Sequence, residues 1–119
     1  MGHVRVTVRI SNPDKEGLAV EVPDAVVDTG ATWTAVPRSV VRDLGLRSTG
    51  SLTLTTAQGP QELEQSFARL EIQGKSLVTH ILISDTLNVV LIGVTTLEAL
   101  GLLVDPSRGE LRETEIYLL

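Results

Sequence analysis

Apolar and polar residues alternate along much of the chain, which is the pattern of half-buried β-strands. From residue 4 to residue 10, four β-branched apolar residues alternate with two arginines and a threonine. Residues 11–17 contain Asn, Pro, Asp and Gly and predict a turn. A second β-rich stretch, residues 18–27, is broken by a Pro-Asp pair. We expect this stretch to end as a strand directly before Asp28.

The rest of the chain continues this pattern and adds two short helical segments. Residues 51–83 alternate again, and two glycine-containing turns divide them into two successive hairpins. Residues 38–44 predict a helix, because Pro37 suits a first helical position and Gly45 a stop. Residues 94–100 predict a second helix with threonine at its start and glycine after its end.

Two further segments complete the predicted domain. Residues 88–93, "NVVLIG", form a continuous apolar run that predicts a strand buried on both faces. Residues 102–119 predict a strand, a Pro-Gly turn and a last strand. A length of 119 residues suits one domain with one site per chain. The sequence therefore predicts a single all-β domain over residues 1–119, with one or two short helices.

The composition argues against several classes of function. The formal net charge is -5 and the basic residues are scattered, whereas a nucleic-acid partner needs a basic stripe. There is no cysteine, and two distant histidines, His3 and His80, give little basis for a metal site, so we expect no metal and no cofactor. The longest apolar run is far too short to span a membrane, and the start lacks the apolar segment of a signal peptide. We expect no nucleic-acid or membrane partner and a cytoplasmic location.

The triplet Asp28-Thr29-Gly30 is the main candidate for chemistry. Asp-Thr-Gly also occurs in ordinary turns, where Asp bonds the backbone and Gly supplies a positive φ. Here it follows two valines and precedes Ala31, and a later apolar run ends in Leu-Ile-Gly before a short helix. With these motifs most of the chain resembles the retropepsin-like aspartic proteases, and looks most similar to their small single-domain prokaryotic members. In that family apolar-apolar-Asp-Thr-Gly-Ala is the catalytic loop and apolar-apolar-Gly before a helix is its structural companion.

This resemblance implies a closed β-barrel that works as a homodimer. Two carboxylates that share one proton can act as base and acid in peptide hydrolysis, and Asp28 supplies one of them. No other Asp-Thr-Gly and no Asp-Ser-Gly occurs, so a second copy of the chain would supply the other carboxylate across a two-fold axis. By the resemblance, Thr29 bonds across to the partner loop and Gly30 leaves room for the carboxylates and the substrate. The apolar end "EIYLL" would pair with the partner's terminal strand.

The resemblance also implies substrate contacts on two segments. Three residues after the triplet would line a substrate pocket: Ala31, Thr32 and Trp33. Three residues would form the tip of a hairpin, residues 55–62, that folds over the substrate as a flap: Ala57, Gln58 and Gly59. The alternatives are a core position for the tryptophan and an ordinary surface hairpin. Away from these segments, His80 is expected as a satisfied strand histidine and Asp85 as a turn residue at a strand end.

The sequence thus predicts an aspartic endopeptidase that hydrolyses polypeptides with an Asp-activated water at a site shared across a homodimer. A first alternative is a non-catalytic dimer of the same fold that holds an extended peptide by backbone hydrogen bonds. A closed or disordered site in the dimer would favour that alternative. A second is a small acidic β-barrel with only a structural role, for which the context of the Asp-Thr-Gly triplet would be a coincidence.

Overall fold

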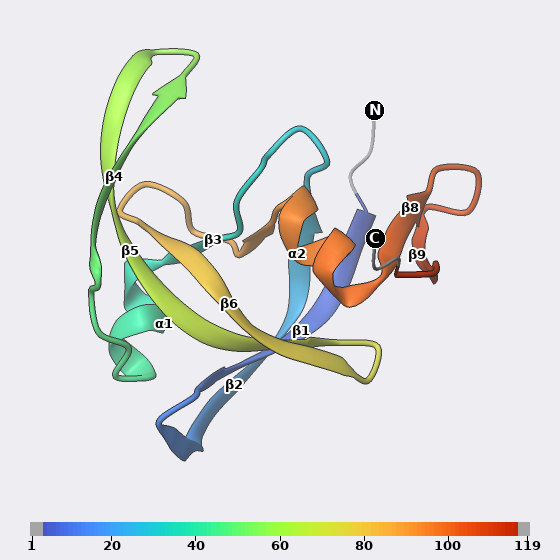
Figure 1. The fold of residues 1–119 in the computed structure, drawn as a ribbon, viewed down its shortest axis with the longest axis horizontal. Helices are drawn as coiled ribbons and strands as arrows, with labels where there is room; N and C mark the ends of the chain where they lie inside the picture. Colours follow the sequence, from blue (N-terminus) through green and yellow to red (C-terminus); the bar gives the residue numbers. More distant parts are fainter. Residues whose placement is uncertain (1–3, 117–119) are drawn as a thin grey trace.

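A computed structural model describes residues 4–116 of the chain (Figure 1). Within them are nine strands and two short helices. In chain order these are β1 Val4–Asn12, β2 Lys15–Val27, β3 Ala35–Pro37, α1 Arg38–Asp43, β4 Gly50–Thr56, β5 Gly59–Ile72, β6 Lys75–Ser84, β7 Leu91–Ile92, α2 Val94–Leu100, β8 Leu102–Asp105 and β9 Glu110–Glu113. The predicted all-β class with two short helices is confirmed. Neither helix in this part of the chain is long and apolar enough to cross a membrane.

Six of the strands close into a ring. The main sheet has the order β1-β2-β7-β3-β6-β5-β4, and β1 also pairs with β5, which joins the two ends of the six-strand part. β4 lies outside this ring and pairs only with the first half of β5, from Gly50↔Gln65 to Thr56↔Gly59. The result is a closed body from which the β4–β5 hairpin projects (Figure 1).

The core fills the interior of the ring, as the alternating pattern predicts. Burial alternates along β5, where every second residue from Ser66 to Ile72 is buried. Large branched side chains from β1, β5, β6, β7 and the region of α2 meet inside and are almost fully buried: Ile10, Leu70, Ile72, Ile81, Ile83, Ile92 and Leu97. Burial of each such side chain is worth about 1.5–3 kcal/mol. This core fixes the strand ends that carry the candidate site.

The structure corrects three local predictions. β2 runs unbroken through the Pro-Asp pair, because the β1–β2 register shifts between Val6↔Ala25 and Val8↔Val22 and so absorbs it as an irregularity. The apolar run 88–93 contains only the two-residue strand β7; before it, Val90 is buried and Val89 half-buried outside any strand. Helix α2 is preceded by a glycine rather than capped by a threonine side chain, because backbone carbonyls of another loop accept its first N–H groups.

Candidate active site

The fold places Asp28 directly after the last residue of β2, a strand that lies between β1 and β7 in the main sheet. β2 and β7 are parallel, with Val26 opposite Leu91 and Val27 opposite Ile92. The Asp28 N–H continues this ladder and donates to the Ile92 carbonyl at 3.0 Å. Asp28 itself is half-buried, whereas Thr29 and Gly30 are exposed. A carboxylate at this position is held by the rigid sheet and still open to a ligand.

The loop after Asp28 turns tightly around its carboxylate. The Gly30 N–H donates to Asp28 Oδ1 at 2.9 Å, and the Ala31 N–H donates to the Asp28 carbonyl at 3.1 Å. A Cβ at position 30 would lie 3.2 Å from the same Oδ1, closer than most side chains tolerate. The glycine of the triplet therefore lets the backbone approach the carboxylate, as the resemblance implied.

Two buried threonines join this loop to the start of α2. Thr34 Oγ1 and Thr96 Oγ1 are 2.6 Å apart, and Thr34 Oγ1 also accepts the Gly93 N–H at 3.0 Å. Both side chains are almost fully buried, so these hydroxyls have no competing water. Sequence reasoning missed this pair. The available signal was a threonine at a buried strand entry and another in the first turn of the following helix.

Backbone contacts fasten the same two segments more closely. The Val94 N–H donates to the Ala31 carbonyl at 2.8 Å, while the Thr95 hydroxyl donates to the Thr32 carbonyl at 2.6 Å. A Cβ at Gly93 would lie 2.4 Å from the carbonyl carbon of Trp33. The Leu-Ile-Gly motif thus ends in a glycine because the candidate catalytic loop passes directly over it.

Trp33 lies on the outer face of the sheet against His80. The two rings are edge to face with centroids 4.7 Å apart. Trp33 is half-buried, which lies between the core position and the open pocket position that were the two alternatives for it. His80 Nε2 and Gln65 Oε1 are 2.6 Å apart, and burial lowers the pKa of His80 below its ordinary value. His80 lies on strand β6 as expected, but it is satisfied at one ring nitrogen only, since within residues 4–116 the buried Nδ1 atom has no hydrogen-bond partner.

The hairpin that was predicted to act as a flap is present as β4–β5. Its turn is Ala57 and Gln58, and the Thr56 hydroxyl donates to the Gly59 carbonyl at 2.7 Å across it. Gly59 has a φ of 103°, which explains the glycine at the tip. Figure 1 shows the tip projecting beyond the body, on the same side as the loop that follows β2. The two predicted substrate-contact segments are thus on one side of the molecule, and no hydrogen bond joins them among the described residues.

One arginine ties the base of this hairpin to two other elements. Arg38, the first residue of α1, donates from Nη2 to Glu64 Oε1 at 2.7 Å, and from Nε and Nη2 to the Asp85 carboxylate after β6. Hydrogen bonds from Arg38 lower the pKa of both carboxyl groups, with Ser48 adding to the effect at Glu64. Asp85 follows a strand end as expected, but its role as an ion-pair partner was not predicted.

The closed ring, the Asp-Thr-Gly loop and the projecting hairpin together define the retropepsin-like class of aspartic proteases. The family model for gag-polyprotein putative aspartyl protease matches residues 20–99, and the chain belongs to this family. The match includes the triplet at Asp28, the hairpin and most of α2. A comparison with curated protein sequences finds no match.

Solved structures with low sequence identity share the fold. The EIAV protease complexed with the inhibitor HBY-793 matches with a TM-score of 0.65 and 18% identity, covering 98% of this chain and 94% of that one. The Simian Foamy Virus (mac) protease, a solution structure, matches with a TM-score of 0.55 and 19% identity, covering 78% of this chain and 90% of that one. At these identities the matches show the retroviral protease fold.

Proposed function

We propose that this protein is an aspartic endopeptidase whose active site forms between two copies of the chain. The observation that carries the proposal is the position of Asp28, which lies half-buried on a rigid loop with Oδ1 bonded to the Gly30 N–H. The family and the fold support protease chemistry. The chain has one Asp-Thr-Gly triplet and therefore supplies one of the two carboxylates that the reaction needs.

In the proposed reaction the two Asp28 side chains share one proton across a two-fold axis. The ionised carboxylate takes a proton from a bound water, and the water oxygen attacks the carbonyl carbon of the scissile peptide. The C–N bond then breaks, and the leaving nitrogen takes a proton from the other carboxyl group. The substrate would lie between two segments: residues 31–33, which follow the Asp-Thr-Gly triplet, and the hairpin tip formed by residues 57–59, which would cover it.

The C-terminal part of the chain supports association with a second copy. Strands β8 and β9 form a two-stranded sheet of their own and, within residues 4–116, pair with each other and with no strand of the main sheet. Ile116, which follows it, is 65% exposed and rests on Gly101, where a Cβ would lie 2.9 Å from Ile116 Cγ1. An exposed isoleucine at this position would gain from burial in a dimer. The predicted pairing through "EIYLL" concerns residues 115–119, of which 117–119 lie outside the described residues.

The test is cleavage of a diverse peptide library by the purified protein, read by mass spectrometry. We expect cleavages with wild type and none with Asp28→Asn, which keeps the size of the side chain but removes its acid–base function. Sedimentation should show a dimer for both proteins, and deletion of residues 117–119 should weaken it together with activity. A dimer that binds peptides without cutting them would instead favour the non-catalytic alternative.

A further inference from the structure

A hollow on the outer surface lies away from Asp28 and has a marked chemical character. It has a volume of about 510 Å³ and lies between the β1–β2 turn, the segment after α1 and the middle of β5 and β6. Its apolar wall includes Leu46, Phe67 and Val78. Phe67 is 48% exposed and Val78 42% exposed, on neighbouring strands whose register places Val78 opposite Arg69. Large apolar side chains exposed together are a common sign of a binding surface.

The charge around this hollow is opposite to that of the whole protein. Lys15 and Arg47 line it, and an adjoining hollow of about 250 Å³ is lined by Arg9 and Arg69. Asp14 is the one acidic residue among the lining residues. None of the four cations forms an ion pair within residues 4–116, although Glu21 and Glu71 are neighbours of Arg9 in the sheet. In a chain of net charge -5, this local excess of positive charge favours an acidic ligand.

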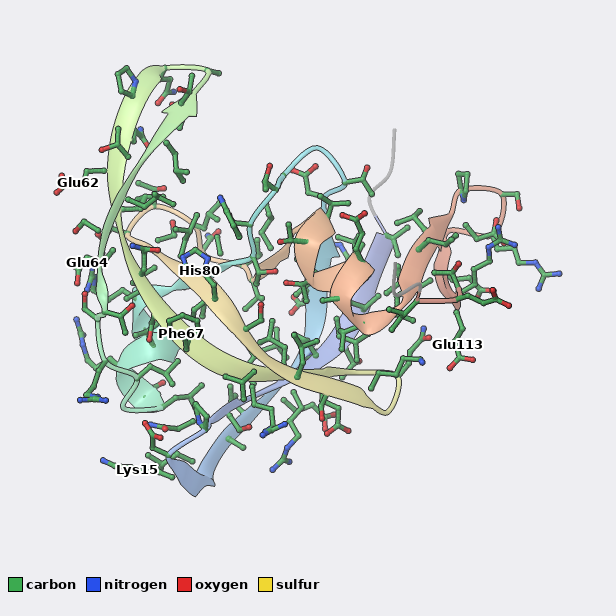
Figure 2. The ribbon with its side chains drawn as sticks, in the orientation of Figure 1. Lys15, Glu62, Glu64, Phe67, His80 and Glu113 are labelled. Atoms are coloured by element: carbon green, nitrogen blue, oxygen red, sulfur yellow. The ribbon has the colours of Figure 1, made fainter. Side chains whose placement is uncertain are left out.

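A line of aromatic rings connects this surface to the candidate catalytic loop. Trp33 is 4.7 Å from His80 and His80 is 6.0 Å from Phe67, measured between ring centroids. Figure 2 shows Phe67 between His80 and Lys15 along this side of the molecule. An extended peptide advances about 3.3 Å per residue, so the two ring-to-ring steps correspond to roughly three residues. A substrate that contacts Trp33 can therefore reach Phe67 without leaving the surface.

We infer that the two adjoining hollows, here called the distal groove, form a second binding site for the polypeptide substrate. The inference rests on the proposed protease function. The groove takes an extended segment in which one aromatic or branched apolar side chain lies on Phe67 and Val78. Acidic residues on either side of that side chain face Lys15, Arg47 and Arg69. Such a site selects substrates by a segment outside the scissile bond and holds them while the catalytic loop acts.

Binding is measured first without any cleavage. The probe is a fluorescein-labelled peptide of glycine and serine that carries one phenylalanine between glutamates and has no site that the enzyme cuts. With the Asp28→Asn protein, fluorescence anisotropy should detect saturable binding that weakens as salt is raised. Phe67→Ser and Arg47→Glu should each weaken binding about tenfold or more, since one removes the apolar anchor and the other reverses a groove charge. The matched control is Arg42→Glu, the same charge reversal on α1 at a side chain outside the groove.

Cleavage is measured next with two substrates that share one cut sequence. One substrate carries the acidic phenylalanine segment several residues from the cut, and the other carries its glycine-serine equivalent. We expect the extension to lower KM about tenfold with little change in kcat, and Arg47→Glu to remove this advantage while Arg42→Glu keeps it. Circular dichroism of each variant shows that the fold is intact.

The outcomes separate the groove from the protease activity. Probe binding that is lost in the groove variants, without any cleavage by wild type, would support the groove and refute the proposed protease. Cleavage with no effect of the extension would support the protease and refute the groove. The inference is also overturned if the same acidic peptide with serine in place of phenylalanine, or inorganic phosphate, competes equally well. It is likewise overturned if Phe67→Ser changes the oligomeric state, because the surface would then contact a second copy of the chain.

Discussion

The candidate catalytic loop and the base of the flap hairpin are both joined to distant parts of the chain, but by different kinds of bond. The loop is held by buried neutral groups, above all the 2.6 Å contact between Thr34 Oγ1 and Thr96 Oγ1. The hairpin is held at its base by the partly exposed charges of Arg38 and Glu64 and the exposed charge of Asp85. Buried hydrogen bonds are costly to break because no water replaces them, whereas exposed ion pairs contribute little and can open and reform.

This difference matches what each region has to do in the proposed reaction. A carboxylate that activates water must stay within a fraction of an ångström of its position, and the threonine pair fixes the loop that carries it. A flap must open to admit a polypeptide and close over it. The ion pairs of Arg38 are screened by solvent, so they allow the hairpin to open while they still favour one resting position. Four predictions test the comparison, beginning with the largest expected effect.

The close approach of the loop to Gly93 should make Gly93→Ala the most damaging small substitution. Its Cβ would lie 2.4 Å from the Trp33 carbonyl carbon and 2.8 Å from the Thr32 carbonyl oxygen, both backbone atoms that cannot rotate away. We expect a loss of about 3 kcal/mol or more in the free energy of unfolding, measured with denaturant. Gly17→Ala is the matched control, because no atom lies within 4 Å of its Cβ, and it should stay within about 1 kcal/mol of wild type. Equal stability of the two variants would show that the loop can shift freely.

The hydroxyl of Thr34 is expected to give the next largest effect. Thr34→Val keeps the shape of the side chain but leaves the buried Gly93 N–H and the Thr96 hydroxyl without their partner. The expected loss of unfolding free energy is about 1–3 kcal/mol, independent of salt. Thr53→Val makes the same change at an exposed position on β4 and should have little effect. If Thr34→Val lost no unfolding free energy, or if its loss varied with salt, the loop would not be held by buried, uncharged hydrogen bonds.

Arg38→Gln should affect movement more than global stability. The substitution breaks both ion pairs at the base of the hairpin, so residues 50–63 should exchange their amide hydrogens a few-fold faster than in wild type. The difference should shrink at high salt, because salt already weakens the exposed pairs in wild type. Arg108→Gln removes an exposed pair with Glu110 in the β8–β9 turn and should leave hairpin exchange unchanged. Unchanged exchange in Arg38→Gln would mean that the ion pairs do not hold the hairpin.

The sequence predicted the parts of this comparison that are local, and missed those that depend on the fold. Asp28 and Gly30 form a continuous motif, and the glycine-containing turns mark the hairpins directly, so both could be found along the chain. The Thr34–Thr96 and Arg38–Asp85 contacts join residues 62 and 47 positions apart. No local pattern pairs one threonine or one arginine with a particular distant partner, because the closed ring of strands brings them together.

The strand boundaries were missed for a related physical reason. Composition made residues 88–93 a complete strand, but their pairing partners are the ends of β2 and the short β3, which leave room for only Leu91 and Ile92. β2 is longer than predicted because its partner β1 tolerates a register shift. An apolar run in the sequence predicts burial, and a proline predicts an irregularity. The length of a strand depends instead on the neighbouring strands with which it pairs.

Lowering the pH should release the base of the hairpin but leave the hydrogen bond between Thr34 and Thr96 in place. Arg38 lowers the pKa of Glu64 and Asp85 in the folded protein, so the ion pairs add stability that is fully present above the unfolded pKa values of about 4. This stability is lost as the pH falls through the lower folded-state values, because the unfolded carboxylates take up protons first. Thermal unfolding should therefore differ between wild type and Arg38→Gln by a constant amount above about pH 5 and converge in more acidic solution. The Thr34→Val difference involves no titrating group and should persist over the same range. Carbon NMR of the two carboxyl groups would locate the transition, and a wild-type versus Arg38→Gln difference that stayed constant into acid would show that these charges do not fasten the hairpin.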